Sequence, residues 1–117
     1  LKRRESIREQ SISSIQASPH LNFAKQSGCV TYSNYFFTIL CDSRNDLAFF
    51  LKSKGVYSTF RYYPLNKINL FAINATVGTM AGSDSFSERA LNIPIHDGLS
   101  DGDVAYICKL LASFTPV

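Results

Sequence analysis

The chain has 117 residues, which is the size of one ordinary domain and excludes two substantial hydrophobic cores. Hydrophobic residues make up 45% and charged residues 18%, a balance that indicates a folded globular chain and excludes disorder. The net charge of +3 is carried largely by the first ten residues, so the chain lacks the extended charge field of a nucleic-acid-binding protein.

The cysteines, Cys29, Cys41 and Cys108, are far apart in the sequence and odd in number. This spacing predicts reduced, buried thiols, with no disulfide framework and no metal site. No apolar run approaches the length of a membrane span, and the basic start lacks the apolar stretch of a signal peptide. We therefore expect a cytoplasmic protein. Because the chain begins at Leu1, we also expect a piece of a longer protein.

The first half of the chain predicts a helix, a strand and a second helix. Residues 1–17 are good helix formers with few apolar side chains, so this helix needs a packing partner. The aromatic and β-branched run YFFTILC, residues 35–41, predicts a strand that is covered on both faces. Residues 43–54 predict a helix, in which Ser43 and Asp46 satisfy the first free amides. Its apolar face consists of Leu47, Phe50 and Leu51.

The second half predicts a further strand and two helices. Residues 56–63 have high β-propensity and end at Pro64, which predicts a strand, and the stretch 67–82 has no clear pattern. Ser85 and Glu88 have the spacing of a capping box, which predicts a short helix to about Leu91.

The segment 93–100 predicts extended chain with a turn, and Ser100 with Asp103 predicts the start of a last helix. Together these elements predict an α+β domain, a small sheet of two to four mostly antiparallel strands packed by helices.

From Asn34 onward, the ordered motifs NYFFTIL, NDLAFFLKSKGVYSTFRYYPLN, SERALNIPIHDGLS and DVAYICKLL resemble the C-terminal small domain of the DegT/StrS family. This family consists of pyridoxal-phosphate (PLP)-dependent sugar aminotransferases of fold type I. The resemblance implies that residues 1–30 are a linking helix and loop region and residues 31–117 the small domain. It also implies that the PLP-binding large domain, with the Schiff-base lysine, is absent, so the fragment alone is expected to be inactive.

The resemblance further implies the substrates and the assembly of the whole enzyme. An amino group passes from an amino-acid donor, glutamate by expectation, to a nucleotide-linked keto-deoxysugar. Such enzymes are usually homodimers with shared active sites. Metal, membrane and nucleic acid are not expected partners.

Departures from the family pattern single out the candidate site residues. Histidines that are common in the family before the first strand and on both sides of the turn are replaced here by Asn34, Arg61 and Asn66. The resemblance implies that this turn lies near the mouth of the active site. An arginine can bind a carboxylate or phosphate with two hydrogen bonds. We therefore expect Arg61 to bind an anionic part of a substrate, with Tyr62 as a ring or hydroxyl contact and Asn34 and Asn66 as further substrate-binding residues.

Several alternatives stay open from the sequence. Arg61 could pair with a surface carboxylate, Asp84 or Glu88, while Tyr63 covers the edge of a core. His96 beside Asp97 could be an oriented base, but an exposed turn histidine is favoured. The paired phenylalanines of the first strand and the helix after it are expected in the core: Phe36, Phe37, Phe49 and Phe50.

A second functional class is a ferredoxin-like module for single-stranded nucleic acid. Its base-stacking residues would be Tyr35, Phe37, Phe60 and Tyr62. The basic residues that normally accompany such a platform are absent from both strands.

Overall fold

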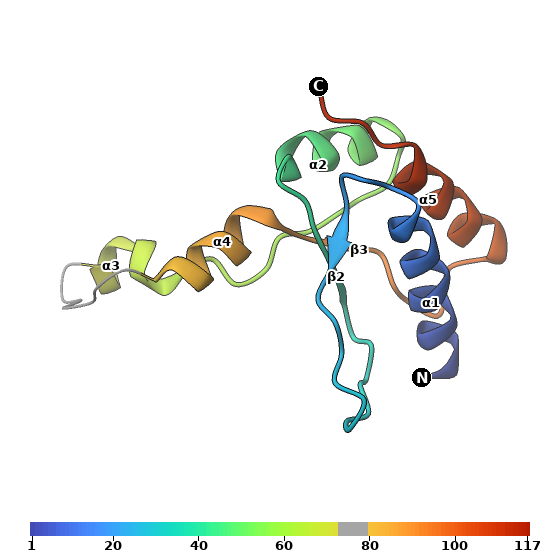
Figure 1. Cartoon of the computed structure of the whole chain (residues 1–117), viewed down its shortest axis with the longest axis horizontal. Helices are drawn as coiled ribbons and strands as arrows, with labels where there is room; N and C mark the ends of the chain where they lie inside the picture. The colour runs from blue at the N-terminus through green and yellow to red at the C-terminus, as the bar shows by residue number, and fades with distance from the viewer. Residues whose placement is uncertain (73–79) are drawn as a thin grey trace.

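A computed structural model describes residues 1–72 and 80–117 of the chain (Figure 1). It is an α+β fold with a three-stranded antiparallel sheet in the order β1-β2-β3, as the sequence predicts. The elements in chain order are α1 (Lys2–Gln16), β1 (Asn22–Phe23), β2 (Phe37–Leu40), α2 (Arg44–Ser53), the 3-10 turn η1 (Leu65–Lys67), α3 (Asn69–Ala72), α4 (Ala81–Arg89), β3 (Ala90–Ile93) and α5 (Asp101–Ser113).

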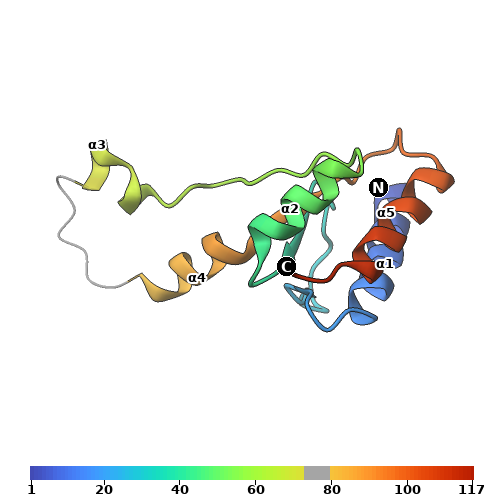
Figure 2. The ribbon, with the colours of Figure 1, turned by 90° about the horizontal axis from the view of Figure 1, so that it is seen from above.

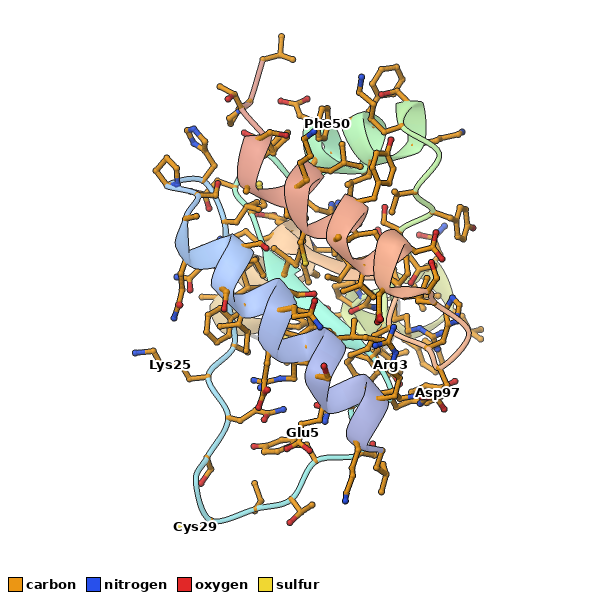
Figure 3. All side chains as sticks on the ribbon, turned by 90° about the vertical axis from the view of Figure 1, so that its right-hand side faces the viewer. Arg3, Glu5, Lys25, Cys29, Phe50 and Asp97 are labelled. Atoms are coloured by element: carbon orange, nitrogen blue, oxygen red, sulfur yellow. The ribbon has the colours of Figure 1, made fainter. Side chains whose placement is uncertain are left out.

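One hydrophobic core lies between the sheet and helices α1, α2 and α5. In β2, Phe37 and Ile39 are buried whereas Thr38 and Leu40 are half-buried, so one face of this strand is fully covered and the other only partly. The partner that α1 needs is α5, which lies beside it (Figures 1 and 3). The helices contribute these core residues: Ile7, Ile15, Leu47, Leu51, Val104, Ile107, Leu110 and Leu111.

Basic side chains at the N-terminus form ion pairs and a hydrogen bond within the chain. Arg3 lies 2.7 Å from Asp101 and donates a 2.8 Å hydrogen bond to the carbonyl of Leu99, while Arg4 lies 3.8 Å from Asp97. These contacts join the start of α1 to the turn that precedes α5 (Figure 3). No helix in the described ranges is long and apolar enough to cross a membrane, and the cytoplasmic location stays a prediction.

The predicted helix caps have different outcomes. At α5 the capping box forms, because the amide of Asp103 donates to Ser100 Oγ at 3.1 Å and the amide of Ser100 donates to Asp103 Oδ2 at 2.9 Å. At α2 the helix is present, but the Ser43 side chain makes no capping hydrogen bond. The predicted box at Ser85 and Glu88 is wrong, since α4 begins at Ala81 and both residues lie within it.

The predicted strand over residues 56–63 is also wrong. This segment is extended but forms only an isolated bridge, in which the amides of Thr59 and Asn92 each donate to the other's carbonyl, at 3.0 and 2.8 Å. Tyr62 has a φ of +63°, a left-handed conformation that cannot continue a strand. The sequence pattern also missed β1, η1 and α3, which are very short. It missed most of β3 as well, because the helix expected to reach about Leu91 ends at Arg89 and a strand begins at Ala90.

Residues 60–72 and 80–89, which we call the arm, project from the rest of the fold (Figures 1 and 2). The remaining helices and the sheet, α1, β1–β3, α2 and α5, form the body. The radius of gyration is 15.7 Å, against about 13 Å for a compact domain of this length. The stretch 67–82, for which the sequence has no clear pattern, includes residues 73–79, which lie outside the described residues.

Ion pairs, a hydrogen bond and a cation–π contact hold the arm to itself and to the body, and one of the ion pairs joins Arg89 of the arm to Asp42 of the body at 2.7 Å. Lys67 Nζ lies 3.4 Å from Asp84 and 3.9 Å from Glu88, which ties η1 to α4. Arg44, at the start of α2, donates a 2.8 Å hydrogen bond to the carbonyl of Ser87 and lies 4.9 Å from the centre of the Phe60 ring. Arg44 thus joins the base of the arm to the body.

Candidate functional site

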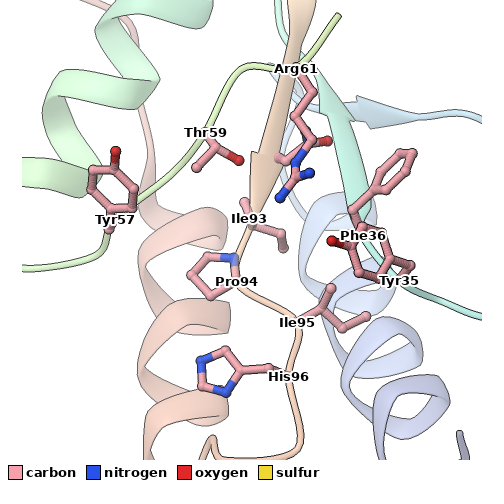
Figure 4. Close-up of a pocket in the computed structure, with 10 residues that line it drawn as sticks. Tyr35, Phe36, Tyr57, Thr59, Arg61, Ile93, Pro94, Ile95 and His96 are labelled. Carbon is pink, nitrogen blue, oxygen red and sulfur yellow. The ribbon is translucent and has the colours of Figure 1, made fainter.

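A cleft of about 310 Å³ opens between the extended segment before the arm, the end of β3 and the residues that precede β2 (Figure 4). The sheet strand β3 forms its floor. Its polar and aromatic lining consists of Tyr35, Phe36, Tyr57, Thr59, Arg61, Asn92 and His96. We call it the Arg61 cleft.

The bridge to β3 places Arg61 in this cleft. Successive side chains of an extended chain point to opposite sides, so Thr59 and Arg61 lie on the same side. Asn92, the partner of Thr59, is buried and accepts a 2.6 Å hydrogen bond from the Thr38 hydroxyl at its Oδ1. Asn92 therefore connects β3 to β2 through its side chain and to the Arg61 segment through its backbone.

Arg61 presents its guanidinium to the cleft without a carboxylate partner. Its Cζ lies 5.5 Å from the centre of the Tyr35 ring, a distance at which a cation is attracted to the ring face. Within the part of the chain that the structure describes, no carboxylate pairs with it. The alternative of a pair with Asp84 or Glu88 is wrong, because both carboxylates lie beside Lys67.

Tyr62 lies in the arm, next to Arg61 in the sequence, but does not line the Arg61 cleft. Its side chain is 76% exposed and its ring centre is 6.4 Å from that of Phe36. With Phe36, Phe60 and Phe86, it borders a smaller apolar hollow of about 80 Å³. Tyr63 is exposed, so the expectation that it covers a core edge is wrong.

Asn34 lies in a second cleft, of about 370 Å³, on the other side of Tyr35 and Phe36. Its backbone is left-handed, with a φ of +51°, and its Oδ1 is buried without a hydrogen-bond partner among the described residues. Arg8 of α1 and Lys25 also border this cleft. We call it the Asn34 cleft.

The predicted site residues therefore fall in different places. Arg61 and Tyr62 are neighbours around Phe36, whereas Asn34 is separated from Arg61 by Tyr35 and Phe36, which line both clefts. Asn66 is half-buried in η1 and does not line either cleft. The substrate role of these four residues stays a prediction.

Sequence reasoning missed several residues around the Arg61 cleft. His96 is exposed, as expected, but it also borders the cleft, while the adjacent Asp97 lies 3.8 Å from Arg4. The sequence did not indicate Tyr57 and Asn92 as cleft residues, because neither belongs to a recognisable motif. Of the phenylalanines expected in the core, Phe37 and Phe50 pack there, but Phe36 and Phe49 are exposed.

The cysteines are all free, but they are not all buried. Cys29 is exposed, Cys108 is half-buried and Cys41 is buried. Burial raises the pKa of the Cys41 thiol, so this group is held in its protonated form. The expectation of buried thiols is therefore wrong for Cys29.

Comparison with known proteins decides the family. The model of the DegT/DnrJ/EryC1/StrS aminotransferase family matches residues 1–112. The chain belongs to this family. GDP-perosamine synthase from Vibrio cholerae is 26% identical over 95 residues, which cover 77% of this chain and 26% of the relative.

Solved structures of family members share the fold. The aminotransferase TlmJ from Streptoalloteichus hindustanus superposes with a TM-score of 0.86 at 29% identity, over 96% of this chain and 30% of that one. The PLP form of the sugar aminotransferase Spr1654 from Streptococcus pneumoniae gives a TM-score of 0.81 at 21% identity, over 96% and 30%. The chain thus spans about a third or less of the length of the relatives it matches.

The family uses PLP, but the residues of this chain do not fit its Schiff-base site. A lysine that forms such a bond at neutral pH is normally desolvated, which lowers its pKa. All six lysines of the chain are exposed: Lys2, Lys25, Lys52, Lys54, Lys67 and Lys109. No step of cofactor chemistry is therefore assigned to these residues.

Proposed function

We propose that this chain is the C-terminal part of a PLP-dependent sugar aminotransferase. The whole enzyme would transfer an amino group from an amino acid, glutamate by expectation, to a nucleotide-linked keto-deoxysugar. The observation that carries this proposal is the family match over residues 1–112, combined with a span of about 30% of the relatives' chains. The exposed lysines support a cofactor site made by residues outside this chain.

The role proposed for this chain is to contribute one wall of the substrate site. Arg61 would bind a phosphate or carboxylate of the substrate, since its guanidinium lacks a carboxylate partner in the described ranges and lies in an open cleft. Tyr62 would supply a ring contact beside it, because its side chain is exposed next to Phe36. Asn66 and Asn34 would make secondary polar contacts.

The domain division belongs to the same proposal. Residues 1–30 would link the large domain to the small domain, residues 31–117, in a cytoplasmic homodimer. The arm supports this assignment, because it exposes large apolar side chains that a larger protein would cover. They include Leu65, Leu70, Phe71 and Phe86.

The nucleic-acid module is not favoured by the structure. A stacking platform needs exposed aromatic residues on adjacent strands, but residues 56–63 form no strand and Phe37 is 5% exposed. A titration with single-stranded RNA at two salt concentrations is expected to show no tight binding. Tight binding that weakens with salt would favour this second function over the first.

The proposed absence of a Schiff-base lysine has a direct test. Micromolar PLP added to the chain is expected to give no Schiff-base absorbance band, and borohydride followed by peptide mass spectrometry is expected to find no stoichiometric lysine adduct. A saturable adduct at one lysine would contradict the proposal. Free lysine at the same total amine concentration is the control for nonspecific reaction.

The proposed activity is tested on a polypeptide that joins this chain to its upstream coding sequence. With PLP, glutamate and a nucleotide-linked keto-deoxysugar, this protein is expected to form 2-oxoglutarate. An Arg61→Gln variant is expected to raise KM for the anionic substrate by about tenfold or more, from the loss of a charge-assisted hydrogen bond. An unchanged KM would show that Arg61 does not bind the substrate. Absence of transamination by the unsubstituted protein would contradict the proposed aminotransferase function.

A further inference from the structure

The Arg61 guanidinium makes one electrostatic contact within the described ranges, and that contact is with the ring of Tyr35. It forms no ion pair and no side-chain hydrogen bond there, and its Cζ lies 5.5 Å from the centre of the ring. Arg44, by comparison, lies over the Phe60 ring and also donates a 2.8 Å hydrogen bond to the carbonyl of Ser87. The position of the Arg61 charge therefore depends mainly on Tyr35.

The backbone fixes these two side chains only at a distance. Arg61 comes two residues after Thr59, which is joined to β3 by two backbone hydrogen bonds. Tyr35 comes two residues before Phe37, which is the first residue of β2 to pair with β3. The two segments are thus anchored on the same strand, and the Arg61 side chain extends along this strand towards Tyr35 (Figure 4).

Tyr35 is itself held by its neighbours. Asn34, directly before it, has a left-handed backbone, and the ring of Phe36, directly after it, meets the Tyr35 ring edge to face with 6.1 Å between the ring centres. Phe36 in turn lies 6.4 Å from the ring of Tyr62. Ring pairs in this geometry are favourable beyond the burial of their area. The Tyr35 ring therefore has a supported orientation, although the residue is 59% exposed.

An aromatic ring can hold a guanidinium without neutralising it. A carboxylate partner would compensate the charge of Arg61 and accept hydrogen bonds from it, and an incoming anion would have to displace that partner. The Tyr35 ring attracts the cation through its quadrupole and carries no net charge, so the charge of Arg61 stays available to an anion. An exposed arginine also loses side-chain entropy when it binds, and a contact that holds it beforehand lowers this cost.

We propose that Tyr35 is a positioning residue for Arg61, whose guanidinium it holds in the Arg61 cleft ready for an anionic group of the substrate. In this role Tyr35 acts through Arg61 and not on reacting atoms. The inference rests on the proposed function for the reaction that Arg61 serves, whereas the ring contact is a property of this chain alone. A cation over an exposed ring is favoured by an amount that corresponds to about a two- to fivefold change in an equilibrium constant.

The first test follows the Arg61 side chain by NMR in this chain, without substrate. Protons above an aromatic ring are shifted upfield, so the side-chain protons of Arg61 are expected to show such a shift in the unsubstituted chain. Tyr35→Leu is expected to remove the shift, whereas Tyr35→Phe, which keeps the ring, is expected to retain it. Arg61 signals that are the same in all three proteins would overturn the proposal.

The second test uses the polypeptide that joins this chain to its upstream coding sequence, in the same transamination assay as Arg61→Gln. Tyr35→Leu is expected to raise KM for the anionic substrate by about two- to fivefold with little change in kcat, and Tyr35→Phe is expected to keep the original KM. In the Arg61→Gln background, Tyr35→Leu is expected to have no further effect, because the two residues act as one unit. Additive losses in the double variant would overturn the proposal.

Tyr63→Leu is the matched control, because Tyr63 is 56% exposed and lies two residues from Arg61, but its ring contacts Phe60 at 6.4 Å between ring centres. It is expected to leave the Arg61 signals and KM unchanged, and an effect equal to that of Tyr35→Leu would overturn the proposal. Circular dichroism checks that each variant is folded.

The two tests separate this inference from the proposed function. An upfield shift that depends on Tyr35, together with no transamination by the joined polypeptide, would support the ring contact and contradict the proposed function. Transamination that depends on Arg61 but not on Tyr35 would support the proposed function and overturn the positioning role.

Discussion

The body and the arm contain similar apolar residues but use them differently. In the body, Leu111 is fully buried in α5, whereas Leu70 in α3 of the arm is 72% exposed. The body closes a core from one sheet and three helices, while the arm is joined to it through Arg44, through Arg89 and through the extended segment. The comparison teaches that apolar side chains of this chain pack into a core in the body but are exposed in the arm.

The largest expected effect on stability comes from truncating a buried leucine of the body, and the same change in the arm is its comparison. Leu111→Ala is expected to lower the free energy of unfolding by about 2–5 kcal/mol, because it leaves a cavity in the core. Leu70→Ala makes the same chemical change in the arm and is expected to cost less than about 0.5 kcal/mol. Urea unfolding followed by circular dichroism measures both, and equal losses would mean that the arm is packed in solution.

A substitution of Arg44 tests how strongly the arm is attached to the body. Arg44→Ala is expected to cost about 1.5–3 kcal/mol, since it removes a charge-assisted hydrogen bond to Ser87 and a contact with the Phe60 ring. Arg61→Ala is the matched control and is expected to change stability little. If both substitutions have the same small effect in urea unfolding, Arg44 does not anchor the arm.

The two serine caps within the body give a smaller, paired prediction. Ser100→Ala is expected to cost about 1 kcal/mol, because its hydroxyl accepts from the Asp103 amide. Ser43→Ala is expected to be nearly neutral, because the Ser43 side chain makes no capping hydrogen bond. Thermal unfolding of the two variants measures the difference, and a larger loss for Ser43→Ala would contradict the described caps.

Asp103 makes the same cap depend on pH. Hydrogen bonds from Ser100, first from its side chain and then from its amide, hold the pKa of Asp103 below its ordinary value. A group with a lowered folded-state pKa stabilises the fold above its unfolded pKa, and this stabilisation is lost as pH falls through the folded pKa. Stability curves of the native chain and Asp103→Asn are therefore expected to converge in acid and diverge towards neutral pH.

Alkylation of the cysteines is expected to have the smallest effect on stability. Cys29 is exposed on the loop before β2 and should react with iodoacetamide in the folded chain without changing its unfolding free energy. Cys41 is buried and its raised pKa disfavours the thiolate, so it should react only after unfolding. Timed alkylation with peptide mass spectrometry measures the order in which the two thiols react. Modification of Cys41 before Cys29 would contradict the prediction.

Local sequence patterns predicted the helices of the body well, because the packing of these helices agrees with their apolar periodicity and capping residues. The helix over residues 43–54 and the cap at Ser100 follow from spacing alone, since apolar periodicity and capping act within one helix. The prediction of a strand over residues 56–63 was wrong because residues with high β-propensity form a strand only beside a partner strand. In this segment only Thr59 pairs with a strand residue, Asn92. The capping spacing at Ser85 occurs by chance inside a longer helix.

The clefts could not be predicted because they form between segments that are distant in the sequence. The family resemblance pointed to Arg61 and Asn34 as parts of one site, but Tyr35 and Phe36 lie between them in the structure. Arg8 had no motif, and its position over the Phe37 ring at the Asn34 cleft depends on where α1 packs against β2. The left-handed backbone of Asn34 is likewise a consequence of folding.

The isolated Thr59–Asn92 bridge has a consequence for how the chain opens. Only two backbone hydrogen bonds join the segment that carries Arg61 to β3, whereas β2 and β3 pair along four residues each. Sub-global opening follows the weakest cooperative unit. The Thr59 amide should therefore exchange with deuterium well before that of Ile39, so Arg61 can be displaced and returned while the body stays folded.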